Sequence, residues 1–224
     1  MQTIGFSGRK QSGKTTAAEY VADRLSSGFG GIVQIVSFAD TIKRIVAQTM
    51  YGQKLFHGSM KSEVAHGKTG REWLQIIGTD WFRHANPDCW VNALHAQITD
   101  LRGIAEMANL DCLVIVPDVR FPNEVKYLQE SGPVIRLTRC PFPEDGHESE
   151  VALDGKTSNG QFILYKRYGN AGVVSDVKFE LNTGGEVTFD HVIINDLMTI
   201  DEKNAVIDKI LRDRGLICNP SDEA

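Results

Sequence analysis

One segment near the start of the chain has the residue types and spacing to bind a polyphosphate. Residues 8–15 read Gly-Arg-Lys-Gln-Ser-Gly-Lys-Thr and satisfy the pattern G-x-x-x-x-G-K-S/T. Gly8 and Gly13 let the backbone turn so that successive N–H groups point at an anion. Lys14 can reach the β- and γ-phosphates, and the Thr15 hydroxyl can ligate Mg²⁺. The segment therefore predicts binding of a nucleoside triphosphate together with Mg²⁺.

A phosphate-binding loop can serve hydrolysis coupled to motion, switching, or phosphoryl transfer to a small molecule. A regulatory GTPase needs the guanine-reading sequence N-K-x-D, and the nearest fragment, Asn195-Asp196, lacks the lysine. Motor and remodelling ATPases usually carry more chain than the 224 residues present here. We therefore expect a kinase that acts on a small molecule.

The elements around the loop follow an alternation of short apolar runs and amphipathic stretches. Strands are predicted at residues 3–6, 32–38, 113–116, 134–137 and 191–194. Helices are predicted at residues 16–25, 40–50 and 124–130, over 71–102 with a break at Asn86-Pro87, and after the capping-box pattern at 199–202. Because buried strands separated by helices favour a mostly parallel sheet, the predicted fold class is α/β.

One segment does not follow this alternation of strands and helices. Residues 155–188 are polar and rich in glycine, with alternating patches at 161–165 and 178–181. This composition predicts either an inserted β-hairpin or a mobile flap.

Composition and charge exclude several classes of protein. Apolar residues make up 42% and charged residues 24% of the chain, which is ordinary globular usage and argues against disorder. The formal net charge of -5 disfavours non-specific binding to nucleic acid. No apolar run approaches the roughly 20 residues of a membrane span, and the first residues do not form a signal peptide. The 4 cysteines form no C-x-x-C pair, so free thiols and a cytoplasmic location are expected.

Further polar clusters lie in the middle of the chain. They read R-E-W-L-Q-I-I-G-T-D at 71–80, N-P-D-C-W-V-N-A-L at 86–94, P-D-V-R-F-P-N-E at 117–124 and H-E-S-E at 147–150. In this order, together with the phosphate loop, the segments resemble the bacteriophage-type deoxynucleoside monophosphate (dNMP) kinases. Members of that family move the γ-phosphoryl group of ATP to a dNMP. The resemblance covers most of the chain, and its motifs are specific when found together.

The resemblance implies an architecture as well as a reaction. It implies the P-loop nucleoside monophosphate kinase fold, a parallel five-stranded sheet flanked by helices with an inserted lid or β-hairpin region. The chain would be one domain over residues 1–224, with the acceptor part at about 55–130 and the lid and insertion at about 140–188. Homodimers are common in the family, and a phage-encoded member would work in the host cytoplasm.

For the donor nucleotide, the resemblance implies contacts to ATP from Gln11, Ser12, Gly13, Lys14, Thr15 and Thr16. Many relatives have Asp where this chain has Thr15, so we expect Mg²⁺ to be handled here as in ordinary phosphate loops. Arg139 lies where the lid of such kinases starts. It would either cover the transferring phosphoryl group or stack on adenine.

For the acceptor, the resemblance implies that Lys10 faces the monophosphate and that Arg71 holds it through two hydrogen bonds. Gly78 would allow the acceptor to approach the backbone closely, and Trp90 would line the pocket for the base. The acceptor pocket would also be lined by Asp118, Arg120 and Glu124. The implied catalytic groups are Lys14, Arg71, Asp118 and Arg120.

Two carboxylates in this set have open roles. Asp118 ends a buried strand, where it could contact Mg²⁺ or its water instead of the acceptor. Asp40 lies in a segment similar to the family's F-A-D-x-x-K, and we expect it to position the acceptor, because a phosphate oxygen needs little help from a general base.

Plainer interpretations compete with these roles. Trp73 and Trp81 have helical spacing and are predicted to pack in the core. Arg71 could be a solvated residue at a helix start, and Asp118 could form a structural ion pair with Arg120. His147 with its acidic neighbours favours a polar turn over a metal site. At the level of function, the alternatives are a kinase similar to dephospho-coenzyme A kinase, or a P-loop ATPase module that acts on a partner.

Overall fold

The computed structural model describes residues 1–26, 28–143, 146–157 and 172–217. The chain falls into two compact units, the first formed by Met1–Ile35 with Asp100–Ala224 and the second by Val36–Thr99. The phosphate loop belongs to the first unit. A single kinase domain over the whole chain stays a prediction.

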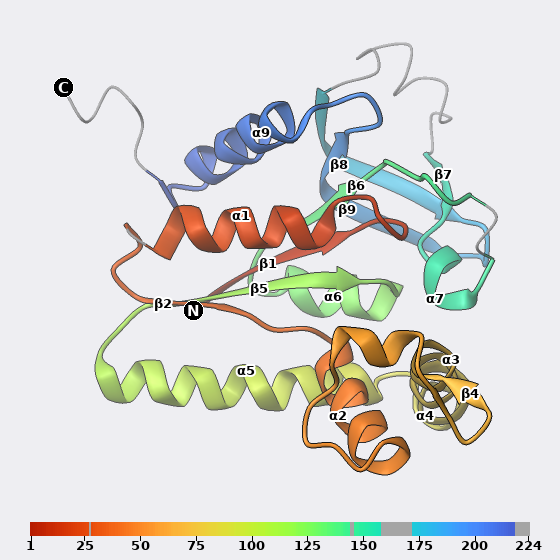
Figure 1. Cartoon of the computed structure of the whole chain (residues 1–224). Coiled ribbons are helices and arrows are strands. Elements are labelled where there is room, and N and C mark those ends of the chain that lie inside the picture. Colours follow the sequence, from red (N-terminus) through yellow and green to blue (C-terminus); the bar gives the residue numbers. More distant parts are fainter. Residues whose placement is uncertain (27, 144–145, 158–171, 218–224) are drawn as a thin grey trace. The chain divides into compact units, whose positions relative to one another are not determined.

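Among the described residues, the first unit is built on a seven-stranded sheet with the order β2-β5-β1-β6-β9-β8-β7 (Figure 1). Five neighbouring strands run parallel: β1 (Gln2–Ser7), β2 (Ile32–Ile35), β5 (Cys112–Val119), β6 (Val134–Leu137) and β9 (Glu186–Ile194). Each overlaps a strand predicted from the sequence, although β9 begins at Glu186, inside the segment predicted as an insertion. The α/β class with a mostly parallel central sheet is therefore confirmed.

Helices cover both faces of this sheet. On one face α1 (Lys14–Ser26) and α9 (Ile200–Asp213) pack on the strands, and on the other lies α6 (Pro122–Gln129) (Figure 1). The alternation along β1 explains the arrangement, because Ile4 and Phe6 face α1 while Gly5 faces α6. A Cβ at Gly5 would lie 2.9 Å from Leu128 Cδ1, so the close approach of α6 depends on this glycine.

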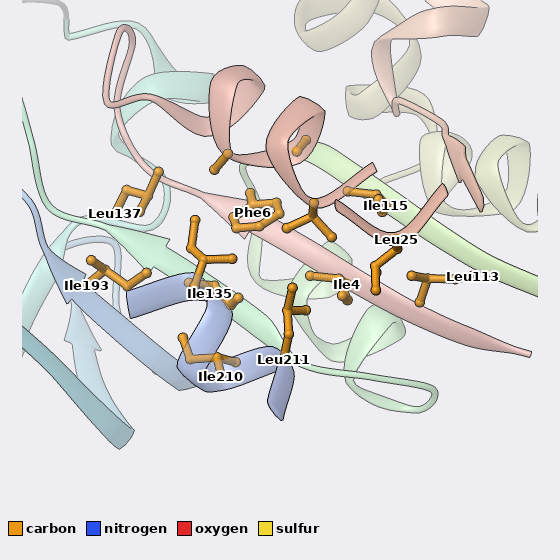
Figure 2. Close-up of a cluster of buried hydrophobic side chains, with 14 residues drawn as sticks. Ile4, Phe6, Leu25, Leu113, Ile115, Ile135, Leu137, Ile193, Ile210 and Leu211 are labelled. Carbon is orange, nitrogen blue, oxygen red and sulfur yellow. The ribbon is translucent and has the colours of Figure 1, made fainter. Parts of the chain in front are cut away.

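Figure 2 shows the apolar cluster beneath α1 and α9. It joins side chains from both helices to the central strands, so both helices pack on the same face of the sheet. Its members include Ile4, Phe6, Ala17, Ala18, Val21, Leu25, Leu113, Ile115, Ile135, Leu137, Ile193, Ile207, Ile210 and Leu211.

The remaining strands extend the sheet at one edge. β8 (Gly172–Leu181) pairs antiparallel with β9, and β7 (Gly155–Thr157) pairs antiparallel with β8. Val177, Phe179 and Leu181 of β8 are buried, so the alternation seen at 178–181 is that of a strand packed on one face. Of the two alternatives left open by the sequence, these residues take the hairpin, and it is part of the main sheet. The patch at 161–165 lies outside the described residues.

The second unit is mostly helical. Its main elements are α2 (Ala39–Met50), α3 (Gly70–Gln75), the π-helical turn η2 (Ile76–Trp81), α4 (Phe82–Ala85) and the start of α5 (Cys89–Ala108). The short pieces are η1 (Gly58–Lys61), β3 (Val64–Ala65) and β4 (Lys68–Thr69). The predicted break before α5 is confirmed, since Asn86 Oδ1 accepts a hydrogen bond from the Asp88 N–H at 3.0 Å. Of the helices described in either unit, none is both long and apolar enough to cross a membrane.

One core prediction in this unit is wrong. Trp81 is 57% exposed, although its spacing from Trp73 suggested a shared buried face. Trp73 is partly buried and donates from Nε1 to the Ala65 carbonyl at 2.8 Å. The π-helical turn η2 lies between them and changes the rotation per residue, so a spacing counted for an α-helix no longer applies.

Candidate functional site

The glycine-rich segment forms a tight loop between β1 and α1, as the sequence predicted. Positive φ angles occur at Gly8 (144°), Gln11 (58°) and Gly13 (97°). A Cβ at Gly8 would lie 2.6 Å from Ser12 Oγ and 2.7 Å from the Leu137 carbonyl oxygen. Glycine is therefore required at position 8, both for its backbone angle and for the space around it.

Lys14 begins α1, and its side chain folds back over the loop. Its Nζ donates to the carbonyl oxygens of Gly8 and Arg9, each at 2.7 Å, and lies 3.5 Å from Ser12 Oγ. The side chain is 8% exposed, and burial, followed by the charge of Arg120, lowers its pKa to about 8. An ammonium held by neutral carbonyls can exchange them for the stronger charge-assisted bonds of phosphate oxygens.

The oxygens near the loop fit a Mg²⁺ ion that is held mainly by phosphates and water. Thr15 is exposed in the first turn of α1, and its hydroxyl bonds to no residue of the described ranges. Asp118, one residue before the end of β5, is half-buried, and its negative charge opposes the lowering of the Lys14 pKa, so it lies within electrostatic reach of the loop. No group of three or more His, Cys, Asp or Glu residues that could hold a metal ion occurs in the described part of the chain. Mg²⁺ does not require such a cage, since it usually keeps several waters and binds one or two protein oxygens plus substrate phosphates.

Arg120 and the phosphate loop share one carboxylate. Glu150, in α7 (Glu148–Val151), forms an ion pair with Arg120 through Oε1. Its Oε2 accepts from the backbone N–H of Lys10 at 2.9 Å. Arg120 Nη1 also donates to the Ser149 carbonyl at 3.0 Å. The predicted polar turn at 147–150 thus forms, and it connects the loop to Arg120.

Glu124 holds the backbone that carries Arg120. Its Oε2 accepts from the N–H groups of Arg120 (2.7 Å) and Phe121 (3.1 Å) at the start of α6, and the residue is 1% exposed. This is a capping and positioning role that the sequence did not reveal. Contact between Glu124 and an acceptor stays a prediction, and the burial of its carboxylate opposes it.

A second carboxylate anchors the other side of the loop. Asp154 pairs with Arg9 of the loop and, at 3.1 Å, with Arg136 of β6. Arg136 is 8% exposed, donates to Ser7 Oγ at 3.2 Å and stacks its guanidinium 5.3 Å from the Phe189 ring. Burial lowers its pKa from the usual value, and the Asp154 charge opposes that shift. Arg136 is therefore a structural cation beneath the site.

Asn195, at the end of β9, supports the loop from a third direction. Its Nδ2 donates to the Ser12 carbonyl at 2.9 Å, and its Oδ1 accepts from the Arg139 N–H at 2.9 Å. The residue is 4% exposed. The backbone of Arg139 is thus tied to the loop through Asn195, while its exposed side chain leaves both predicted lid roles open.

In the second unit, Asp40 and Arg71 occupy different environments. Asp40 accepts from the Ser37 N–H at 2.9 Å and pairs with Lys43 at 3.1 Å, so it stabilises the start of α2. Arg71 is exposed near the start of α3 and makes no hydrogen bond or ion pair within the ranges that the structure describes. Its guanidinium is therefore available for a ligand, as the resemblance implied, and that role stays a prediction.

Gly78 and Trp90 contact each other inside the same unit. Trp90 is 3% exposed, and its Nε1 donates to the Gly78 carbonyl at 2.6 Å. Its ring packs 5.4 Å from that of Phe82, measured between centroids. A Cβ at Gly78 would lie 3.1 Å from Ile42 Cδ1, so this glycine allows α2 to approach. Both residues have packing roles here, and their predicted contacts with a nucleotide stay predictions.

Sequence comparison relates the chain to viral proteins. A provisionally named deoxynucleotide monophosphate kinase of Acanthamoeba polyphaga mimivirus is 34% identical over an alignment of 170 residues, which covers 68% of this chain and 82% of the mimivirus protein. The chain belongs to the deoxynucleotide monophosphate kinase family. ORF76 of Ictalurid herpesvirus 1 (strain Auburn), a protein without an assigned function, is 26% identical over an alignment of 179 residues, which covers 77% of this chain and 62% of ORF76. No protein-family profile matches the chain.

In this member of the deoxynucleotide monophosphate kinase family, the phosphate loop is supported by three polar residues. Sequence patterns did not connect these residues with the loop. Glu150, Asp154 and Asn195 bond to loop residues 140, 145 and 183 positions away. Only Asn195 had a usable signal, since it follows a predicted strand and the carboxyl ends of parallel strands meet at one edge of a sheet. The two carboxylates lie in segments that have no such regularity.

Proposed function

We propose that the chain transfers the γ-phosphoryl group of ATP to a deoxynucleoside 5′-monophosphate, giving ADP and the deoxynucleoside diphosphate, on a P-loop nucleoside monophosphate kinase fold. The observation that carries the proposal is the loop at residues 8–15 with the buried Lys14, whose Nζ lies 2.7 Å from two loop carbonyls. Membership of the family supports the acceptor class, and the motifs of the middle segments favour the bacteriophage-type subgroup.

On the donor side, the backbone N–H groups of residues 11–16 and the start of α1 would hold the phosphates of ATP. Lys14 would exchange its bonds to loop carbonyls for bonds to the β- and γ-phosphates. Mg²⁺, when bound, would neutralise charge on the transferring group and its neighbours, with Thr15 as its protein ligand and Asp118 acting through water.

On the acceptor side, a monophosphate needs cations close to the donor. Lys10 and Arg120 both lie in the first unit, and Glu150 links the backbone of one to the guanidinium of the other. Arg71 would add a third cation, and its exposed guanidinium has the geometry for two parallel bonds to a phosphate. Asp40 would position the acceptor.

The reaction requires mainly that the two substrates are positioned and that their negative charges are neutralised. An acceptor phosphate oxygen attacks the γ-phosphorus, the bond to the β–γ bridging oxygen breaks, and ADP leaves with the electron pair. The acceptor oxygen is already ionised, so no general base is required. Lys14, Lys10, Arg120 and Arg71 would balance the charges of two anions held side by side.

A coupled assay of ADP release tests the proposal. The purified chain is given Mg²⁺ and ATP with each of the four dNMPs, with their ribonucleotide counterparts, with dephospho-coenzyme A, with DNA, and with no acceptor. We expect ADP release to depend on a dNMP, and Lys14→Met to remove it with every acceptor. Release that depends on dephospho-coenzyme A, that occurs without an acceptor, or that is stimulated by DNA would each overturn the proposal.

A further inference from the structure

Lys203 is a buried cation without a counter-ion. It lies in the first turn of α9, is 5% exposed, and forms no hydrogen bond or ion pair through its side chain with any residue in the ranges that the structure describes. Burial alone lowers the pKa of its ammonium, and no neighbouring negative charge opposes that shift. A buried charge without a partner disfavours the folded state, so its presence calls for a reason outside the stability of the fold.

The helix itself does not explain the lysine. A cation in the first turn of a helix faces the positive end of the helix dipole. The adjacent Glu202 does not compensate for it, because its Oε2 accepts from the Thr199 N–H at 2.8 Å and from the Thr199 hydroxyl at 3.0 Å. Glu202 thus serves as a cap for α9.

The ammonium lies against the phosphate loop. Lys203 Nζ is 3.7 Å from the point where a Cβ on Gly13 would stand, and Asn195 Nδ2 is 4.0 Å from the same point. Because Gly13 carries no side chain, nothing of residue 13 beyond its backbone separates the loop from this ammonium. Asn195 already donates to the Ser12 carbonyl at 2.9 Å, and Lys203 forms no hydrogen bond to that oxygen.

The packing of α9 keeps the ammonium in this place. Ile207, Ile210 and Leu211 hold the helix on the core cluster, and Ile207 stands one turn after Lys203 on the same face. The side chain therefore reaches the loop from a helix that is fixed by its apolar face.

We propose that Lys203 is a donor-nucleotide-binding residue that contacts ATP beside Gly13, an inference that rests on the proposed function for the identity of the ligand. Its ammonium donates to an acceptor atom of the nucleotide, either a phosphate oxygen or an acceptor of the nucleoside part. The nucleotide would supply the negative charge or lone pair that the described part of the protein does not offer to this ammonium.

Calorimetric titration of the full chain with ATP in the presence of Mg²⁺ tests this contact. Lys203→Met keeps most of the length of the side chain and removes its charge, and Lys203→Gln is a second neutral variant. We expect each to weaken ATP binding by about tenfold to a hundredfold, the effect of losing a charge-assisted hydrogen bond. Lys209→Met, on an exposed position of the same helix, serves as the matched control and should bind ATP like the wild type.

Two further readouts separate binding from structure. Because the unpaired ammonium disfavours the folded state, Lys203→Met should melt at or above the temperature of the ligand-free wild type. Titration with tripolyphosphate locates the contact: a matching loss places it on the phosphates, and an unchanged affinity places it on the nucleoside.

The outcomes distinguish this inference from the proposed function. If the wild type binds ATP and both neutral variants bind it within about twofold, the inference is overturned and the proposed function stands. It is also overturned if the neutral variants lose ATP affinity only together with a lowered melting temperature, since that is the signature of a structural residue. A wild type that does not bind ATP would overturn both.

Discussion

The Glu150 carboxylate accepts a hydrogen bond from the backbone N–H of Lys10 at 2.9 Å, within the phosphate-binding loop. The other oxygen of the same carboxylate is paired with Arg120. A negatively charged group is thus held by a loop amide and a guanidinium, which are the kinds of donor that bind phosphate. Under the proposed function, Glu150 and the acceptor phosphate compete for these donors.

This relationship predicts the effect of neutralising Glu150. Glu150→Gln removes the ion pair with Arg120 while keeping the shape of the side chain, so Arg120 becomes easier for a phosphate to recruit. We expect KM for the dNMP to fall by about threefold to tenfold, with KM for ATP unchanged. Steady-state kinetics with varied acceptor measures this, and Glu148→Gln, exposed in the same turn, is the control. A raised acceptor KM would show instead that Glu150 positions Arg120 for binding.

The lowered pKa of Lys14 predicts how ATP binding depends on pH. The pKa is about 8, chiefly because of burial and then because of Arg120, so the ammonium loses its proton between pH 7 and 9. ATP binding needs the charged form, and we expect affinity to fall by about tenfold over that interval. Lys14→Arg keeps its charge, so a titration series in both proteins should show the fall in the wild type alone. An equal fall in both would assign it to another group.

The same pKa has the opposite consequence for stability. A lysine in the unfolded chain keeps the usual value of 10.5, so between about pH 8 and 10.5 the unfolded chain binds more protons than the folded one. The contribution of Lys14 to the free energy of unfolding therefore rises with pH across this window. The free energy of unfolding, measured with denaturant, should therefore rise with pH in the wild type relative to Lys14→Met. The same pH dependence in both proteins would contradict the lowered pKa of Lys14.

Replacement of Arg71 is expected to affect the KM values of the two substrates differently. Its exposed guanidinium has no partner within the described ranges, so Arg71→Ala should leave the fold intact. Under the proposed function we expect KM for the dNMP to rise about tenfold or more while KM for ATP stays the same. Arg44→Ala, an exposed arginine of the same unit, is the matched control. An unchanged acceptor KM would remove Arg71 from the site.

Asn195 predicts a coupled loss of stability and donor binding. Asn195→Ala leaves the Ser12 carbonyl and the Arg139 N–H without their buried partner. We expect the free energy of unfolding to fall by about 1–3 kcal/mol and KM for ATP to rise, because the loop loses its support from β9. Thermal melts and donor kinetics measure both effects, with Asn92→Ala on an exposed face of α5 as the comparison. A destabilised variant with an unchanged KM for ATP would show that the loop keeps its shape without this bond.

The pattern of apolar residues was enough to predict the five parallel strands and the helix break at Asn86, because both depend on neighbours in the chain. The phosphate loop was equally readable, since glycine positions and the following lysine determine its backbone and its charge locally. Spacing failed at Trp81, where a π-helical turn altered the helical period. It also could not show that Trp90 donates to Gly78 in the interior of the second unit.

By itself, then, the order of residues along the chain determined the α/β class and the glycine-rich loop between β1 and α1 with its own lysines. Only the tertiary structure decided which distant carboxylates and amides surround that loop: Glu150, Asp154 and Asn195 reach it from 140 or more positions away, and Lys203 stands beside Gly13 without a partner among the described residues. The physical reason is that local backbone preferences act over a few residues. Pairing between polar side chains depends on which ends of strands and helices the packed core brings together.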